Sequence, residues 1–254
     1  MTGQPAGDSW YPAGMAGSRS ISALAERFAL DDAQAAALEA YVDLLHGWKR
    51  ANVTGLRSRE EIIEKLLGDS LAMLDVPQVR ERAGAGWLDL GAGAGIPGIP
   101  LAVALPAVGL TLLEAAARKC QFLEAAVAPA GIGSRARVVC ARSESYAAAP
   151  PGRDGASVVL ARAVAPLPVL VELAAPLLAP GGILLASKTA AAADEEGAAA
   201  EAAAGLCGLR PGPVVRMVRS PLSQAVCAVY EKIGPTPVRF PRREGVAAKR
   251  PLVT

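Results

Sequence analysis

A glycine-rich turn is the sequence feature that most constrains the fold. A short apolar segment at residues 87–90 leads into glycines at positions 91, 93, 95 and 98, and a second apolar segment follows from residue 99. Glycine adopts the positive φ angles of a tight turn and lets a ligand approach the backbone closely. The pattern therefore predicts a strand, a glycine turn and a helix, an arrangement that binds nucleotide-containing cofactors in α/β proteins.

The rest of the chain has the alternation of an α/β protein. Short apolar runs alternate with helical segments, and the runs lie at residues 86–90, 110–113, 136–140, 157–161 and 182–186. Such alternation is typical of a parallel sheet covered on both faces. Two further strands are predicted near 214–218 and 225–230, and they should pair antiparallel because a parallel crossover needs about a dozen residues. The alanine-rich run 189–204 is interpreted as a crossover helix, with a flexible linker as the alternative.

Composition divides the chain into four parts. Residues 1–20 are rich in Gly, Pro and Ser and are predicted to be a disordered extension. Residues 21–83 have apolar residues three and four apart, which predicts a helical cap before a main domain at 84–234. Residues 235–254 form a basic tail, and the wider segment 205–254 holds nine Lys and Arg against two Asp and Glu. This asymmetry indicates either a polyanionic partner or a solvated tail.

The cysteines and the hydropathy favour a cytoplasmic protein. The four cysteines (Cys120, Cys140, Cys207 and Cys227) have apolar surroundings and no CxxC spacing, so we interpret them as reduced core residues and predict neither a disulfide nor a metal site. The first 20 residues contain no apolar signal-peptide core, and no segment approaches the ~20 apolar residues that span a bilayer. We expect a monomer without a membrane segment.

Two cofactors compete for the glycine turn. Glycines 93, 95 and 98 match the GxGxxG pattern of dinucleotide-binding proteins, whereas glycines 91, 93 and 95 match the GxGxG loop of adenosylmethionine-dependent enzymes. The second register starts directly at the strand end, after Asp89, and the C-terminal strand pair also favours it. Glu114 ends the next strand and fits the acid that binds a ribose. The predicted fold class is a Rossmann-like class I methyltransferase with a seven-stranded, mostly parallel sheet, an antiparallel C-terminal strand and a helical N-terminal cap; a turn without a ligand is the alternative.

Several motifs together resemble the RsmG/GidB family of ribosomal RNA methyltransferases, over about residues 48–252. The segment DLGAGAGIPGIPL at 89–101 is similar to the family's D-x-G-[ST]-G-x-G-[LF]-P-G-[IL]-P-L. Asn-Val-Thr at 52–54, Asp-Ser at 69–70, and the tail from FPRR at 240–243 to KRPL at 249–252 also resemble family motifs. The sequence departs from the family pattern at Leu66, Gly68, Ala161 and Thr189, where the family has His, Leu, Ser and Gly. These departures leave the glycine loop intact.

The resemblance implies an enzyme that uses S-adenosyl-L-methionine to methylate N7 of one guanine in the 16S rRNA of the small ribosomal subunit. Either naked 16S rRNA or the small subunit is the expected partner. The cofactor-binding residues that the resemblance implies are Gly91, Ile96, Ser143, Glu144 and Arg162. The loop argument adds Asp89, Gly93, Gly95 and Glu114.

The residues fit this chemistry. Guanine N7 has a free lone pair and no proton to lose, so the reaction needs alignment rather than a general base, and no catalytic residue is predicted. The predicted RNA contacts are Asn52, Lys188, Arg242, Arg243, Lys249 and Arg250. Arg162 as a salt-bridge partner and Asn52 as a plain turn residue are the alternatives for those two. A small-molecule methyltransferase and a non-catalytic RNA-binding protein on the same fold are the alternative functions.

Overall fold

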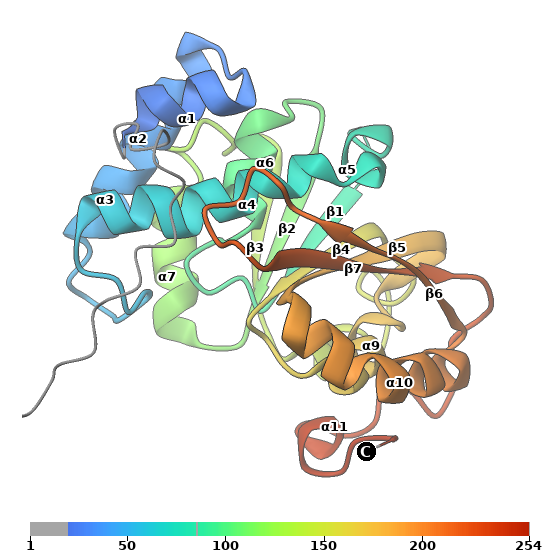
Figure 1. Cartoon of the computed structure of the whole chain (residues 1–254). Helices are drawn as coiled ribbons and strands as arrows, with labels where there is room; N and C mark the ends of the chain where they lie inside the picture. The colour runs from blue at the N-terminus through green and yellow to red at the C-terminus, as the bar shows by residue number, and fades with distance from the viewer. Residues whose placement is uncertain (1–19, 85, 254) are drawn as a thin grey trace, which may run out of the picture.

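The computed structural model describes residues 20–84 and 86–253. Its seven strands are β1 (Gly86–Leu90), β2 (Gly109–Glu114), β3 (Ala136–Cys140), β4 (Ala156–Arg162), β5 (Leu178–Thr189), β6 (Leu209–Arg216) and β7 (Ala225–Lys232). They form one sheet in the order β3-β2-β1-β4-β5-β7-β6 (Figure 1). Strands β1 to β5 are parallel, β7 is antiparallel to β5, and β6 is antiparallel to β7. This confirms the predicted fold class and the antiparallel pair.

The strand order indicates that a ligand would bind at the carboxyl ends of the central strands. The chain builds outward from β1 to β3 on one side and from β4 to β5 on the other. Open α/β sheets bind ligands outside the carboxyl ends of their strands at such a switch point. The carboxyl ends of β1, β2 and β4 are Leu90, Glu114 and Arg162, so these residues share that edge.

Helices cover both faces of the sheet. One face carries α1 (Ile21–Phe28), α2 (Asp32–Gly47), α3 (Arg59–Glu61), a π-helical segment (Ile62–Gly68), α4 (Asp69–Leu71), a 3-10 turn (Ala72–Asp75), α5 (Pro77–Glu81), α6 (Gly98–Ala104) and α7 (Ala117–Ala126). The other carries α8 (Ser143–Tyr146), α9 (Leu167–Ala174), α10 (Ala190–Cys207) and α11 (Val246–Lys249). Adjacent residues of β1 serve both cores, because Trp87 packs into the first and Leu88 into the second.

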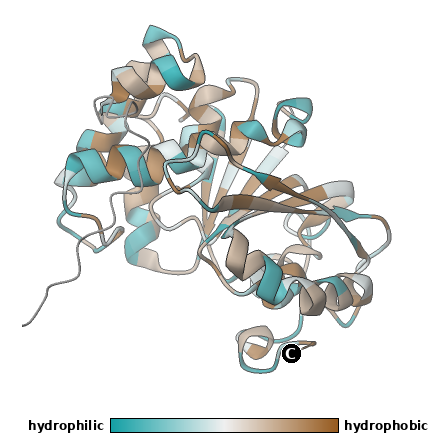
Figure 2. Ribbon diagram, viewed as in Figure 1, coloured by the Kyte–Doolittle hydropathy of each residue, from teal (hydrophilic) through white to brown (hydrophobic). Residues whose placement is uncertain are grey.

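The hydropathy of the elements agrees with this layering. Figure 2 shows hydrophobic residues concentrated in the strands and in the helix faces against the sheet, with hydrophilic residues on the outer turns. In the described part of the chain, no helix is both long and apolar enough to cross a bilayer.

Side-chain caps fix where the N-terminal helices begin. Ser20 accepts a hydrogen bond from Ala23 N at 3.3 Å at the start of α1. Asp31 and Gln34 form a reciprocal capping box at the start of α2, a motif that satisfies two otherwise unpaired N–H groups. Gln34 also donates to the carbonyls of Val103 and Ala104, at 3.1 and 3.2 Å, and so joins α2 to the end of α6. The predicted extension, residues 1–20, lies outside the described residues except for Ser20.

The alanine-rich run forms a helix, as predicted. Thr189 caps the start of α10 by accepting from Ala192 N at 3.2 Å, and Gly208 ends it with φ of 81°. A glycine at this position tolerates the left-handed conformation that closes many helices. The small side chains of Ala200, Ala203 and Ala204 are fully buried against the second core, so tertiary packing holds this helix in place.

The prediction that all four cysteines are reduced is wrong for one pair. Cys120 on α7 and Cys140 at the end of β3 form a disulfide, with their Cα atoms 5.9 Å apart. Cys120 lies close to Cys140 because α7 connects β2 to β3 and packs back on β3. Cys207 and Cys227 are free and buried, as expected.

Candidate functional site

The glycine turn has the geometry that its sequence predicts. Gly91, Gly93 and Gly95 have φ of 68°, 57° and 83°, values that side-chain-bearing residues rarely adopt. The amides of Gly91 and Ala92 both donate to the Leu113 carbonyl, at 2.8 and 3.0 Å, which ties the turn to the end of β2. The turn between β1 and α6 is therefore held to β2, and Gly91 at its start is exposed at the carboxyl end of the sheet.

The carboxylate of Asp89 links the end of β1 to the start of α6 by a hydrogen bond. The carboxylate is completely buried; Oδ2 accepts from Gly98 N at 2.8 Å, and Oδ1 has no hydrogen-bond partner among the described residues. Burial raises the pKa of Asp89 to about 7, since no water solvates its charge. A Cβ on Gly98 would lie 2.6 Å from Asp89 Oδ2, so Gly98 permits this contact. Asp89 does not line the pocket described next.

A pocket of about 260 Å³ lies at the carboxyl ends of β1, β2 and β4. Four predicted cofactor residues line it: Gly91, Glu114, Ser143 and Glu144. Val164, after β4, forms another part of its wall, and a Cβ on Gly91 would come within 3.1 Å of Val164. We call this cavity the loop pocket.

Glu114 is oriented toward the glycine turn by backbone hydrogen bonds. Its Oε2 accepts from Gly93 N at 2.9 Å, and its Oε1 accepts from Ala116 N at 2.8 Å. A carboxylate oxygen has two lone pairs, so each oxygen can still accept from a hydroxyl group. A turn with glycines at positions 91, 93 and 95 beside a fixed carboxylate fits the nucleoside part of adenosylmethionine.

Arg162 lies in a second pocket, of about 630 Å³, which Lys188 and Asp69 also line. Its Nε donates to Asp69 Oδ2 at 2.8 Å, and its Nη2 donates to the Lys65 carbonyl at 3.1 Å. Asp69 is 2% exposed and also accepts from Ser220 Oγ at 2.7 Å. Arg162 is thus a salt-bridge partner that joins the N-terminal helices to the end of β4, and it faces this second pocket, not the loop pocket.

The two pockets adjoin across a short loop. Ala163 lines the second pocket, and Val164 and Ala165 line the loop pocket. Ala163 has φ of 55°, a conformation that costs energy for a residue other than glycine and is enriched at functional sites. Lys188 braces the loop, since its Nζ donates to the Ala165 carbonyl at 3.0 Å and to Glu196 at 2.8 Å.

The predicted RNA contacts are not all free. Arg243, Lys249 and Arg250 are exposed, but Arg242 forms a two-pronged ion pair with Glu172, which is 2% exposed. Asn52 is exposed in the loop after α2, where it lines a separate hollow with Trp48 and Arg57.

Two features of the site were missed at the sequence level. Glu172 was not singled out in the sequence, and the tail was expected to provide RNA contacts only. The tail instead reaches the loop pocket, where Gly245, Ala247 and Ala248 line the wall. The one available signal was the glycine of the tail motif, which sits where α11 begins with φ of 72°.

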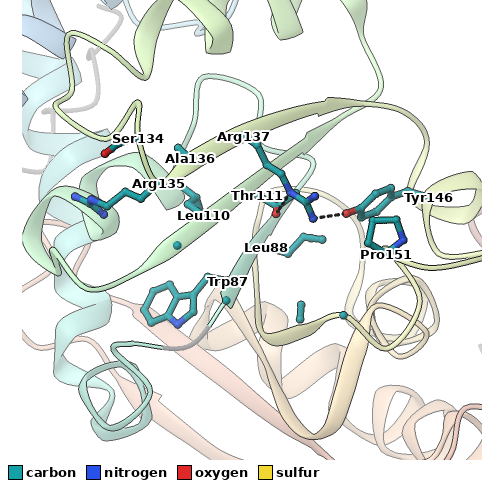
Figure 3. A pocket seen from close by; sticks show the side chains of 15 residues that line it. Trp87, Leu88, Leu110, Thr111, Ser134, Arg135, Ala136, Arg137, Tyr146 and Pro151 are labelled. Carbon is teal, nitrogen blue, oxygen red and sulfur yellow. Dashed lines mark hydrogen bonds between the residues drawn. The ribbon is translucent and has the colours of Figure 1, made fainter.

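A further pocket, of about 380 Å³, lies at the opposite edge of the sheet, where β1, β2 and β3 begin. Figure 3 shows Arg137, on β3, pointing toward Tyr146, with Trp87 and Leu88 on β1, two strands away. Arg137 donates to Thr111 Oγ1 and to Tyr146 Oη, both at 2.9 Å. None of the predicted site residues is among the described residues of this lining, and the edge is opposite to the one where such sheets bind ligands.

The sequence is similar to those of known proteins. The family model described as "GidB: rRNA small subunit methyltransferase G" matches residues 34–219. Ribosomal RNA small subunit methyltransferase G of Rubrobacter xylanophilus is 40% identical over 224 residues, which cover 86% of this chain and 84% of that protein. The protein of the same name from Desulfitobacterium hafniense is 36% identical over 214 residues, covering 84% of this chain and 87% of that protein.

Solved structures support the fold alone. A cofactor-bound protein from MTB, Rv0187, has a TM-score of 0.52 at 18% identity and covers 84% of this chain and 95% of its own. The S-adenosylmethionine-dependent methyltransferase SibL, in its apo form, also has a TM-score of 0.52 at 18% identity, over 84% of this chain and 72% of its own. From the extent of the sequence matches, this chain belongs to the GidB family, described as rRNA small subunit methyltransferase G.

Proposed function

We propose that this protein transfers a methyl group from S-adenosyl-L-methionine to N7 of a guanine in 16S rRNA. The observation that carries the proposal is the loop pocket, in which Glu114 is fixed beside a glycine turn, in a chain of this family. The names of the relatives support rRNA of the small subunit as the substrate class. The residues that would hold the cofactor are Gly91, Gly93 and Gly95 with Ile96 in the turn, Glu114 at the ribose, and Ser143 and Glu144 at the start of α8.

The bound cofactor would supply an electrophilic methyl group on a sulfonium. The protein's task is to align guanine N7 with that methyl group, because N7 has a free lone pair and no proton to remove. The loop pocket and the second pocket adjoin at loop 163–165, and we place the guanine in the second pocket at this junction, where N7 can reach the methyl group. Arg162 and Lys188 would contact the nucleotide there. Their carboxylate partners, Asp69 and Glu196, hold both cations in position.

The RNA backbone would bind along the C-terminal tail. Arg243, Lys249 and Arg250 are exposed there, and Arg243 also lines a hollow of about 510 Å³ together with Arg153. Cations on such a surface neutralise phosphates and make affinity dependent on salt. Asn52 is proposed as a further contact, from the exposed loop after α2. We propose further that the protein is a monomer in the bacterial cytoplasm, in which residues 21–83 form a cap on a domain at 84–234.

The direct test is methyl transfer to a defined substrate. The protein is incubated with labelled adenosylmethionine and small ribosomal subunits or 16S rRNA from a strain that lacks its own enzyme of this family, and the nucleosides are then analysed. We expect label in a single N7-methylguanosine. A Glu114→Ala variant is the control and should lose the label together with cofactor affinity.

Other outcomes separate the alternative functions. Cofactor binding without label in any RNA would refute the proposal and favour a small-molecule methyltransferase. Binding of rRNA without binding of the cofactor would refute it in favour of a non-catalytic RNA-binding protein.

A further inference from the structure

The C-terminal segment is held against the main domain at its start. Phe240 is 1% exposed, in the core formed with α9 and α10. Arg153 donates to the carbonyls of Phe240 and Thr236, at 2.8 and 3.1 Å. The residues that follow, 240–253, are called the strap. Figure 1 shows α11, within the strap, on the same side of the sheet as α9 and α10.

One arginine anchors the strap through a buried carboxylate. Arg242 Nε donates to Glu172 Oε1 at 2.6 Å, and Arg242 Nη2 donates both to Glu172 Oε2 and to the Arg250 carbonyl, the latter at 2.8 Å. The hydrogen bonds with Glu172 raise the pKa of Arg242 above its ordinary value. A buried carboxylate is costly without a cationic partner, so the pair holds the strap in one position. The bond to Arg250 closes the strap into a loop around α11.

The anchored strap touches the loop pocket. Gly245 N donates to Glu144 Oε1 at 2.9 Å, and Glu144 is a predicted cofactor residue. Gly245, Ala247 and Ala248 line the same cavity as Gly91 and Glu114. Their side chains are minimal, which leaves the cavity open while the backbone of α11 closes one side of it.

We propose that the strap is a wall of the cofactor site and that Arg242 is a positioning residue, which acts on the cofactor through Glu172 and α11. This inference rests on the proposed use of adenosylmethionine and assigns Arg242 a role other than the RNA contact expected from its charge. The basic residues of the tail thus have two different roles. Arg242 faces inward and orders the cofactor wall, whereas Arg243 and Lys249 face solvent beside it.

The experiment measures cofactor affinity in the full-length protein, by calorimetric titration with S-adenosylhomocysteine. We expect Arg242→Ala to raise the dissociation constant at least about tenfold, because a wall that is no longer held must be ordered on binding. Arg242→Lys should give an intermediate value, since lysine keeps the charge but not the two-pronged geometry. Arg243→Ala is the matched control. It should leave the cofactor dissociation constant within about twofold of wild type while weakening rRNA binding.

A second variant tests the wall while leaving the ion pair between Arg242 and Glu172 unchanged. Ala248→Phe places a large side chain at the lining of the loop pocket, and it should also raise the dissociation constant at least about tenfold while thermal unfolding stays near that of wild type, because residue 248 is exposed. Hydrogen exchange gives an independent readout: S-adenosylhomocysteine should slow exchange of the amides of residues 245–250 in wild type and not in Arg242→Ala.

The outcomes are distinct. Wild-type cofactor affinity in both Arg242→Ala and Ala248→Phe overturns the inference, and so does an equal loss of affinity in Arg243→Ala, which would indicate a general charge effect. If Arg242→Ala does not fold, the inference is tested by the cofactor affinity of Ala248→Phe and by hydrogen exchange at residues 245–250 of the wild-type protein. Failure of rRNA methylation with these affinity changes intact would refute the proposed substrate and leave the strap inference standing.

Discussion

The ion pair between Asp69 and Arg162 should contribute several kcal/mol to stability, and Asp69→Ala tests this. Asp69 is 2% exposed and accepts from both Arg162 and Ser220, which lie on the sheet side of the N-terminal helices. Breaking a buried pair by removing one partner costs about 3–5 kcal/mol. The Arg162 side chain is 20% exposed, so water partly compensates its lost partner. We therefore expect Asp69→Ala to lower the free energy of unfolding by about 3 kcal/mol, the lower end of that range.

The free energy of unfolding is measured by urea denaturation, and thermal unfolding should show a decrease in Tm of about 6–12 °C for a domain of this size. The matched control is Arg210→Ala, which removes an ion pair with Glu231 whose side chains are 62% and 40% exposed. Exposed pairs contribute at most about 1 kcal/mol. The double variant Asp69→Ala/Arg162→Ala should cost less than the sum of the two single variants, by about 1–2 kcal/mol.

Two results would refute this reasoning. One is a cost for Asp69→Ala no greater than that of Arg210→Ala, which would mean that the pair is not effectively buried. The other is strict additivity in the double variant, which would mean that the two side chains do not stabilise each other.

Three further predictions concern the glycine turn, the buried acid and the tail. Gly91→Ala should weaken S-adenosylhomocysteine binding measured by calorimetry, because φ of 68° strains alanine and its Cβ would meet Val164; unchanged affinity would exclude the turn as the cofactor contact. Asp89 keeps its proton up to a pKa of about 7 when folded, against 3.8 when unfolded, so its contribution to stability should fall between pH 4 and pH 7 and stay constant above. Asp89→Asn should remove this dependence in urea denaturation at pH 5 and pH 8, and an identical dependence in the variant would contradict the assignment. Lys249→Ala should lower the slope of log affinity for rRNA against log salt by about 0.7–0.9, and an unchanged slope would show that Lys249 contacts no phosphate.

Much of the fold could be predicted because it is encoded locally. Strands β1 and β3 occupy the predicted residues 86–90 and 136–140, because short apolar runs bounded by turn residues report burial within a sheet. The antiparallel pairing of β6 and β7 followed from the length of their connection. The left-handed glycines 91, 93 and 95, and Glu114 beside them, followed from spacing.

The contacts between distant segments could not be predicted in this way. The Cys120–Cys140 disulfide depends on how α7 packs on β3, and sequence spacing alone argued for reduced cysteines. Arg162 was open between ligand contact and salt bridge until the fold brought Asp69, 93 residues away, to its guanidinium. The amphipathic pattern of a helix shows that a side chain is buried but not which partner it meets.

The sequence by itself determined the class of sheet, the glycine turn and the family to which these motifs point. The tertiary structure decided how the basic tail is used. Arg242 and Arg243 are adjacent and chemically alike in the sequence, yet one is paired with Glu172, 70 residues away, and the other faces solvent. The physical reason is that a charged residue's role depends on the dielectric surroundings and counter-charge that the folded chain supplies, and neither is a local property of the sequence.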